Sequence, residues 1–185
     1  QVVPAGGAAP QAPAPTGSVV TRMSMYPYAV KDSAGNTYAA RSGFTGGDLV
    51  DLIPASTDIA GTNDDVLYRS EFIRFGSWSH PLAAGTYDVT LKMREGFWDK
   101  AGQRVFDVVA EGATRLSGVD IYAAVGKNTA YDRTFRVDVR DGRLDMSTVN
   151  RVDLAAISAI VVSKADGAPA PTQPPAPTQT PQPTP

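Results

Sequence analysis

The stretch GTYDVTLKMREGFWDKAGQRVFDVVA, residues 85–110, holds two alternating runs on either side of an aromatic pair. In the first run every second side chain is apolar, at Tyr87, Val89, Leu91 and Met93. The second run repeats the alternation at Phe106, Val108 and Ala110. Because successive side chains of a strand point to opposite faces of a sheet, this pattern predicts two β-strands that each bury one face.

The aromatic pair, Phe97 and Trp98, lies in a charged segment flanked by Gly96 and Gly102. In a regular strand only one residue of such a pair faces the core. On a loop both rings are able to point in the same direction, and the glycines predict a loop over residues 96–102. We therefore expect the two rings to be exposed at an edge or end of the sheet. The alternative is that one of them covers an end of the core.

Alternation returns in the second half of the chain. The segment RTFRVDV, residues 133–139, has apolar residues at Phe135, Val137 and Val139. The dipeptide Asp141-Gly142 follows and predicts a tight type I′ hairpin, because this turn needs positive φ angles. The apolar segment AAISAIVVSK, residues 155–164, predicts a buried closing strand.

Weaker strand patterns occur earlier, at residues 19–26, 36–42 and 66–76, and a short helical turn is expected at residues 118–126. The glycine-rich SGFTGGD, residues 42–48, has neither the lysine nor the context of a phosphate-binding loop and is interpreted as a turn. Short strands without a convincing amphipathic helix predict an all-β fold. We expect an antiparallel β-sandwich of jelly-roll type.

Proline marks the two ends of the chain. Of fifteen prolines, four fall in residues 1–18 and eight in residues 169–185. Both ends lack charged side chains, and they contain too little apolar surface to offset the entropy of ordering. The composition therefore predicts disordered linkers at residues 1–18 and 166–185 around one folded domain at residues 19–165.

Charge and composition exclude several classes of partner. The formal net charge of −2 gives no basic surface for nucleic acid, and no apolar run approaches the length of a membrane span. There is no cysteine, so disulfides and a cysteine nucleophile are excluded. The chain begins with Gln1 and has no charged-then-apolar leader, which indicates a processed or excised piece. Pro/Thr linkers favour a secreted multidomain protein.

Catalysis and metal binding find little support in the sequence. The only histidine, His80, is interpreted as structural. Because the chain has a single histidine, a metal site built from several histidines is excluded. Glycoside hydrolysis needs two acids that flank one bond, and the acids Glu71, Glu95 and Asp153 are too common a feature to identify such a pair. The Asn63-Asp64-Asp65 cluster contains oxygen ligands suited to calcium, but such clusters before strands are usually turns. We expect the chain to have no enzymatic activity and to bind no metal or cofactor.

A resemblance to a known family covers most of the folded part, from about Val30 to Val162. The chain resembles the malectin domain, carbohydrate-binding module family 57, in the ordered segments DSAGNTYAARSGFTGG, VLYRSE, GTYDVTLKMREGFWDKAGQRVFDV, AYDRTFRVDV and VDLAAISAIVV. The resemblance implies a galactose-binding-like jelly roll that binds glucose-containing oligosaccharides, with no catalysis and no obligate cofactor.

The resemblance also implies site residues. Tyr68 takes the place of the aromatic in the family's "LY" motif, Phe97 and Trp98 that of its adjacent aromatic pair, and Asp153 that of its acid before the last strand. Phe44 is the nearest candidate for a further family aromatic. In family members these positions converge at one end of the sandwich.

One segment departs from the family pattern. Members usually have Asn-Ala-Gly-Gly where this chain has Ser24-Met25-Tyr26-Pro27. Bulkier residues there predict a narrower or differently bounded site, and Tyr26 adds a possible stacking surface.

Together these observations predict a secreted, noncatalytic module that binds an oligo- or polysaccharide, expected to be a glucan, and that linkers join covalently to neighbouring domains. The alternative is a structural or protein-interaction β-sandwich that binds no glycan.

Overall fold

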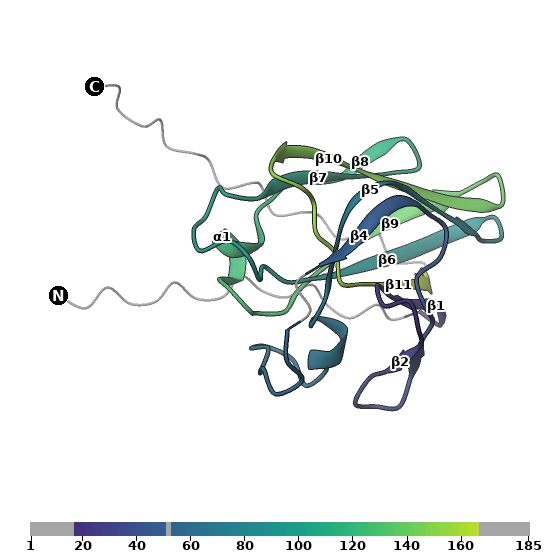
Figure 1. The fold of residues 1–185 in the computed structure, drawn as a ribbon. Helices are drawn as coiled ribbons and strands as arrows, with labels where there is room; N and C mark the ends of the chain where they lie inside the picture. The colour runs from purple at the N-terminus through teal and green to yellow at the C-terminus, as the bar shows by residue number, and fades with distance from the viewer. Residues whose placement is uncertain (1–16, 51–52, 167–185) are drawn as a thin grey trace, which may run out of the picture.

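The computed structural model describes residues 17–50 and 53–166, which form an all-β fold of two packed antiparallel sheets (Figure 1). The predicted sandwich is confirmed. The linkers expected at residues 1–18 and 166–185 lie outside the described residues, except for their innermost positions 17, 18 and 166.

Each sheet combines strands from distant parts of the chain. The four-stranded sheet has the order β1 (Val19–Ser24), β11 (Ala159–Lys164), β6 (Gly85–Met93) and β9 (Tyr131–Val139). The five-stranded sheet has the order β4 (Phe44–Val50), β5 (Glu71–Pro81), β10 (Arg143–Val152), β7 (Val105–Ala110) and β8 (Ala113–Val119). A separate small ribbon pairs β2 (Val30–Lys31) with β3 (Thr37–Tyr38), and two short helical turns, η1 (Asp65–Leu67) and α1 (Ile121–Val125), lie in the loops.

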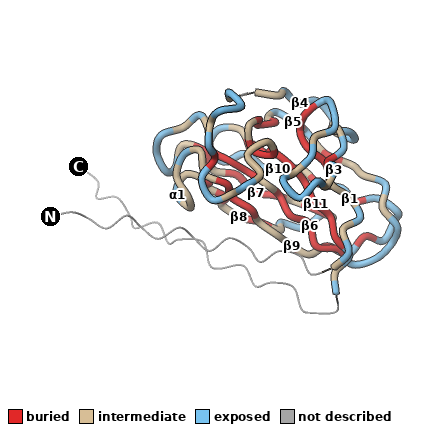
Figure 2. Tube along the Cα trace, turned by 90° about the horizontal axis from the view of Figure 1, so that it is seen from below, coloured by how far each residue is buried: buried red, intermediate tan, exposed pale blue. Residues whose placement is uncertain are grey.

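The core lies between the two sheets, where the inner faces of the strands are buried (Figure 2). The predicted inward residues of β6 are all buried: Tyr87, Val89, Leu91 and Met93. Those predicted for β7 and β9 are buried as well: Phe106, Val108, Ala110, Phe135, Val137 and Val139. Period-two alternation therefore identified the buried face of three strands correctly.

The Asp141-Gly142 prediction was wrong. β9 pairs only with β6 in one sheet, whereas β10 pairs with β5 and β7 in the other, so the intervening residues cross between sheets and close no hairpin. Gly142 has a φ of 85°, but Asp141 does not share a positive φ, as a type I′ turn requires. The dipeptide signals a sharp turn, and the tertiary packing decides which strand comes next.

The interpretation of SGFTGGD as a turn was also wrong, because these residues enter the edge strand β4. A register shift lies between Thr45 and Gly46, and Gly47 has a φ of 108°. A Cβ atom at Gly47 would lie 2.1 Å from the ring of Phe72. The glycines therefore let a strand bend closely over a core ring.

One end of the sandwich gathers loops that carry candidate site residues. β1 and β6 both pair antiparallel with β11, so they run in the same direction and end together, with Ser24 and Lys92 both opposite Ala159. The loop after β6 then crosses to β7 in the other sheet, near the start of β5 and the predicted helical turn α1 (Figure 1).

His80 lies on β5, where its ring stacks on Trp78 with centroids 5.3 Å apart. Its Nε2 atom is 3.0 Å from the hydroxyl of Thr21 in the other sheet. This environment agrees with the structural role expected from the sequence. Burial penalises the charged imidazolium and lowers the pKa of His80 below its ordinary value.

We predict that Gly47→Ala lowers the free energy of unfolding by about 2 to 4 kcal/mol, because the new methyl group collides with Phe72 and the backbone has a positive φ. The matched control is Gly35→Ala, since Gly35 also has a positive φ but no atom within 4 Å of an added Cβ. It should lose only about 1 kcal/mol. Urea denaturation of both variants measures the difference, and equal losses would contradict the packing argument.

We predict that the unfolding free energy falls as the pH drops from 7 through about 6.5 towards 5. Over this range the unfolded chain gains a proton at His80 while the folded chain, with its lowered pKa, resists it. Above the unfolded pKa this contribution is fully present. His80→Asn should flatten the profile between pH 7 and 5 in thermal melts, and an unchanged slope would assign the effect to other groups.

Candidate functional site

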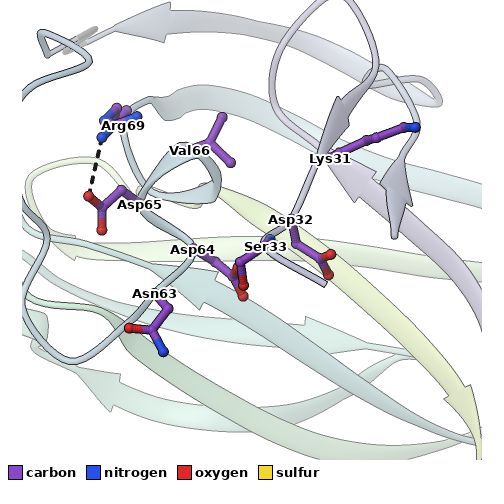
Figure 3. A pocket seen from close by; sticks show the side chains of 8 residues that line it. All are labelled: Lys31, Asp32, Ser33, Asn63, Asp64, Asp65, Val66 and Arg69. Carbon is purple, nitrogen blue, oxygen red and sulfur yellow. Dashed lines mark hydrogen bonds and ion pairs between the residues drawn. The ribbon is translucent and has the colours of Figure 1, made fainter. Parts of the chain in front are cut away.

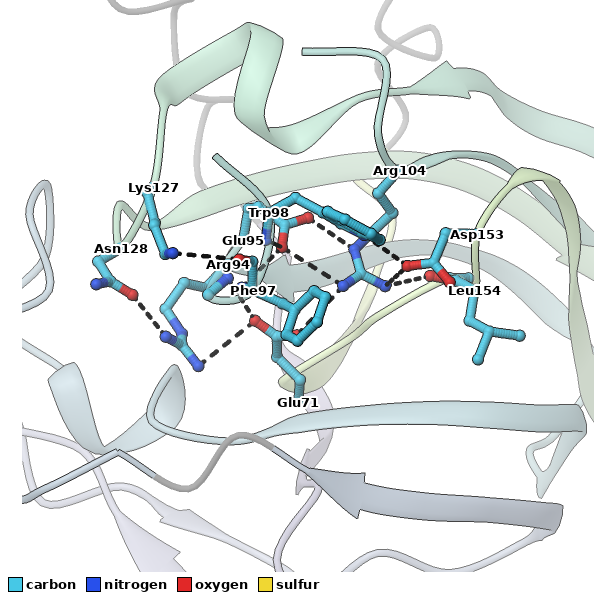
Figure 4. A network of polar contacts seen from close by, with 12 residues as sticks. Glu71, Arg94, Glu95, Phe97, Trp98, Arg104, Lys127, Asn128, Asp153 and Leu154 are labelled. Atoms are coloured by element: carbon cyan, nitrogen blue, oxygen red, sulfur yellow. Dashed lines mark hydrogen bonds and ion pairs between the residues drawn. The ribbon is translucent and has the colours of Figure 1, made fainter. Parts of the chain in front are cut away.

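The candidate site lies where the loop after β6 meets the connection between β10 and β11 (Figure 4). Phe97 is 64% exposed, and Trp98 is half-buried beside it. The two rings meet edge to face, with centroids 4.8 Å apart and an interplanar angle of 87°. The indole Nε1 of Trp98 donates a hydrogen bond of 2.6 Å to Oδ2 of Asp153. The structure thus brings three of the sequence-predicted residues together.

Asp153 occupies an unusual backbone position, with a φ of 54°. Non-glycine residues in this left-handed region carry strain that concentrates at functional positions. Its carboxylate lies 3.6 Å from Nη1 of Arg104 as well as against the indole, while 31% of the side chain stays exposed. The carboxylate is therefore fixed from two sides and still open to a ligand.

Glu95 fixes the backbone beneath the aromatic pair. Its Oε1 accepts hydrogen bonds from the amides of Phe97 at 3.0 Å and Trp98 at 2.9 Å. Its Oε2 accepts a 2.7 Å hydrogen bond from Nε of Arg104. Because both amides point inward to this buried carboxylate, the loop is curled around Glu95 and the rings are carried on its outer side.

Glu71, the first residue of β5, holds the same loop from the five-stranded sheet. Its Oε1 accepts a 2.7 Å hydrogen bond from the amide of Gly96. The same atom lies 3.4 Å from Nη2 of Arg94, and its Oε2 lies 3.7 Å from Nη2 of Arg104. One carboxylate therefore contacts two arginines and the loop backbone.

Arg94 extends the network to the neighbouring loops. Its Nε donates to the carbonyl of Tyr68 at 2.7 Å, and its Nη1 donates to Oδ1 of Asn128 at 2.6 Å. The amide of Asn128 donates to the carbonyl of Glu95 at 2.9 Å. On the outer side, Lys127 donates to the carbonyl of Phe97 at 3.2 Å. The aromatic loop is thus tied to the segment after α1.

The network balances its charge in the interior. Glu71, Arg94, Glu95 and Arg104 are each at most 5% exposed. Burying one such ion alone is very costly, and two acids with two arginines offset each other when their hydrogen bonds are made. Burial opposes the charge of Arg104, but the hydrogen bond to Glu95 and the charges of Glu95, Glu71 and Asp153 outweigh it and raise its pKa.

This arrangement bears on the glycoside-hydrolase alternative. Of the three acids considered for glycoside hydrolysis, Glu71 and Glu95 are buried and paired with arginines, and only Asp153 reaches solvent. A pair of acids facing one glycosidic bond is therefore not formed by these residues. Their contacts are those of a scaffold for the loop.

Tyr68 requires a correction, because its ring is only 1% exposed and lies in a second core cluster with Leu67 and Tyr38. Its hydroxyl donates a 2.6 Å hydrogen bond to Asp132 and accepts one of 3.1 Å from Lys92. Burial, with the charge of Asp132, raises its pKa well above the ordinary range. Tyr68 is therefore not a stacking surface, although its carbonyl supports Arg94.

Tyr26 and Phe44 differ from the expectation as well. Tyr26 is 7% exposed and lies under Tyr28, whose ring is 57% exposed, with centroids 5.2 Å apart. Phe44 is half-buried on β4, where it packs edge to face on Phe72 and Phe75 of the core. Both predicted rings are thus occupied by protein contacts, and Tyr28 presents the exposed surface.

A polar cavity of about 290 Å³ lies at the Asn63-Asp64-Asp65 cluster, near β2 and η1 (Figure 3). Asp64 accepts a 2.8 Å hydrogen bond from the amide of Ser33, and Asp65 pairs with Arg69 at 3.2 Å. Among residues 17–50 and 53–166, no three acidic or histidine side chains are arranged to share a metal ion. Asp64 and Asp65 are thus both used in contacts within the protein.

The supporting network was missed by the sequence analysis. Glu71 and Arg94 are 23 positions apart and Arg104 comes from the next strand's start, so no local pattern reveals that they meet. The charged dipeptide Arg94-Glu95 follows the inward-facing Met93, but charged residues are mostly exposed, so the dipeptide alone did not indicate a buried ion pair.

Two packed sheets with loop aromatics and a carboxylate at one end define a jelly-roll β-sandwich of the kind found in lectins. The Malectin domain family matches residues 20–168, and the chain belongs to this family. Membership points to a carbohydrate-binding module and away from an enzyme. Within the described residues, no helix has the length and apolar character of a membrane span.

Malectin-B of Xenopus laevis is 30% identical over 86 residues, which are 45% of this chain and 31% of that protein. Malectin of Homo sapiens is 29% identical over 86 residues, 45% of this chain and 30% of that protein. The chain therefore spans about a third of the length of the curated relatives it matches.

Solved structures share the fold. The extracellular domain of ANXUR2 from Arabidopsis thaliana gives a TM-score of 0.69 at 14% identity, over 80% of this chain and 49% of that chain. A beta-glucuronidase of Bacteroides uniformis gives a TM-score of 0.69 at 13% identity, over 79% of this chain and 18% of that chain. At such identities the likeness concerns the fold alone.

We predict that Glu95→Gln lowers the unfolding free energy by about 3 kcal/mol, because it leaves the buried Arg104 without its closest counter-charge. Amide hydrogen exchange at Phe97 and Trp98 should accelerate. The matched control is Asp99→Asn in the same loop, because Asp99 is 76% exposed and pairs with Lys127 at the surface. It should cost less than about 1 kcal/mol. Equal losses would show that burial of the network is unimportant.

Proposed function

We propose that this domain is a noncatalytic carbohydrate-binding module that receives a sugar ring on Phe97 and Trp98. The observation that carries the proposal is the exposed ring of Phe97, which meets Trp98 edge to face on a loop anchored by the buried charge network, while the indole of Trp98 is hydrogen-bonded to Asp153. A ligand that covers the exposed phenyl ring removes apolar surface from water, which favours binding. Because the buried network anchors the loop, the ring is held in one place at the surface, where a ligand can reach it.

The chemistry of the three groups suits a saccharide. The CH-bearing face of a sugar ring packs on the apolar face of Phe97, and the exposed part of the indole of Trp98 meets it from the side. Sugar hydroxyls need polar partners, and the open part of the Asp153 carboxylate accepts their hydrogen bonds. Since the loop is already ordered, binding loses little conformational entropy.

The finer features of the proposal follow from family membership and composition. Glucose-containing oligo- or polysaccharides, expected to be glucans, are the proposed ligands. The Pro/Thr-rich ends are proposed as linkers that join the module covalently to neighbouring domains of a secreted protein. In such a protein the module raises the local concentration of its neighbours at a polysaccharide, so a weak single-site affinity suffices.

We predict that Phe97→Ala and Trp98→Ala each weaken binding by about tenfold or more, because each loses a ring contact and its buried area. Binding is measured on a glycan array and then by calorimetry with the best ligand. Val20→Ala is the control, because Val20 is a 43% exposed apolar residue on β1 that has no part in the candidate site, and it should leave the affinity unchanged.

Two results would contradict the proposal. Full affinity in both Phe97→Ala and Trp98→Ala would remove the aromatic pair from the site. Absence of binding by the unmodified chain to glucans and to other plant, algal or microbial polysaccharides would favour a structural or protein-interaction module.

A further inference from the structure

A second aromatic surface lies at the same end of the sandwich as the Phe97 and Trp98 pair. Tyr28 follows β1 by four residues, and its ring is 57% exposed. Because β1 and β6 run in the same direction and end opposite the same residue, Ala159, the segment after β1 and the aromatic loop after β6 leave the sheet at one end.

The Tyr28 ring is held in place from beneath. It stacks on Tyr26 with centroids 5.2 Å apart and an interplanar angle of 23°, and Tyr26 itself is buried. One face of Tyr28 is therefore used by the protein, and the other is turned outward. A ring fixed in this way loses less rotational freedom when a ligand covers it than a free side chain does.

The support of Tyr26 is continuous with the support of the aromatic loop. Arg41 donates from its amide to the carbonyl of Tyr26 at 3.0 Å and from Nη1 to the carbonyl of Met25 at 2.9 Å. Its guanidinium also lies 5.3 Å from the ring centre of Phe72, the residue after Glu71. Glu71 in turn accepts from the amide of Gly96 in the aromatic loop.

Charged residues near the start of β5 also influence the Tyr26 hydroxyl. Burial raises the pKa of Tyr26, while the neighbouring Ser70 and the charges of Arg69 and Arg94 act in the opposite direction. Ser70 directly precedes Glu71, and Arg94 pairs with Glu71 at 3.4 Å. Residues that hold the first aromatic surface thus also act electrostatically on the base of the second.

We infer that Tyr28 forms a second sugar subsite, so that the domain binds a saccharide chain long enough to reach from the Phe97 and Trp98 pair to Tyr28. This inference rests on the proposed function. Two separated rings on one end of the molecule fit successive or nearby units of a chain, and an exposed tyrosine adds a hydroxyl that exchanges hydrogen bonds with sugar hydroxyls. A monosaccharide or disaccharide bound at Phe97 does not require contact with Tyr28.

The test is calorimetry with glucose oligomers of two to eight units, in the α-1,4, β-1,3 and β-1,4 series, on the 185-residue chain. The unmodified chain should bind longer oligomers more tightly in at least one series. Tyr28→Ala should weaken binding of the long oligomers by about two- to tenfold and leave the shortest bound oligomer unaffected. Tyr28→Phe should keep most of the gain with length.

Two variants serve as controls. Phe97→Ala should weaken binding at every length, which identifies the first subsite. Val149→Ala removes another exposed apolar side chain, on β10, and should change nothing. Thermal melts of each variant show that it remains folded, as expected for Tyr28→Ala because most of its ring lies in solvent.

The outcomes separate the two proposals. If Phe97→Ala loses binding but Tyr28→Ala matches the unmodified chain at every length, the second subsite is overturned and the proposed function stands. Equal losses for Tyr28→Ala at every length also overturn it, because length dependence is what defines a separate subsite. If the unmodified chain binds no oligomer in any series, both proposals fail.

Discussion

The hydrogen-bonded pair of Glu95 and Arg104 is the interaction on which the candidate site depends. A loop that crosses from one sheet to the other exposes backbone amides to the end of the core, where they need acceptors. Glu95 accepts from two such amides, and a buried carboxylate in that role needs a counter-charge. Arg104 supplies it at 2.7 Å and also donates to the carbonyl of Leu154. One ion pair therefore joins the aromatic loop to the connection that carries Asp153.

The position of the two rings follows from that pair. The space beneath the loop is filled by carboxylates and guanidinium groups, so an aromatic ring turned inward would separate charges that need each other. Phe97 consequently faces solvent, and Trp98 lies against Asp153, which fixes its indole by a hydrogen bond. The site is preorganised, because the groups that would meet a ligand are already held by contacts with the protein.

Sequence alone predicted what local pattern encodes. Alternation gave the buried faces of β6 and β7 because a strand's side-chain period is a property of neighbouring residues. The hairpin prediction at Asp141-Gly142 was wrong because the pairing of β10 is set by distant strands. The prediction that Tyr68 is a stacking surface was wrong because a motif position does not report burial. The arginine and glutamate network was invisible, since its members meet only in three dimensions.

The burial of Tyr68 changes its expected role without removing it from the end of the molecule that holds the candidate site. Its hydroxyl is fixed by Asp132 and Lys92, and its carbonyl receives Nε of Arg94. An arginine with so little exposure keeps its position only while its donors are satisfied, so a fixed carbonyl helps to place it. Arg94 in turn contacts Glu71, which holds the loop amide of Gly96. Tyr68 would thus influence the position of the aromatic loop through three successive polar contacts, although its own ring touches no ligand.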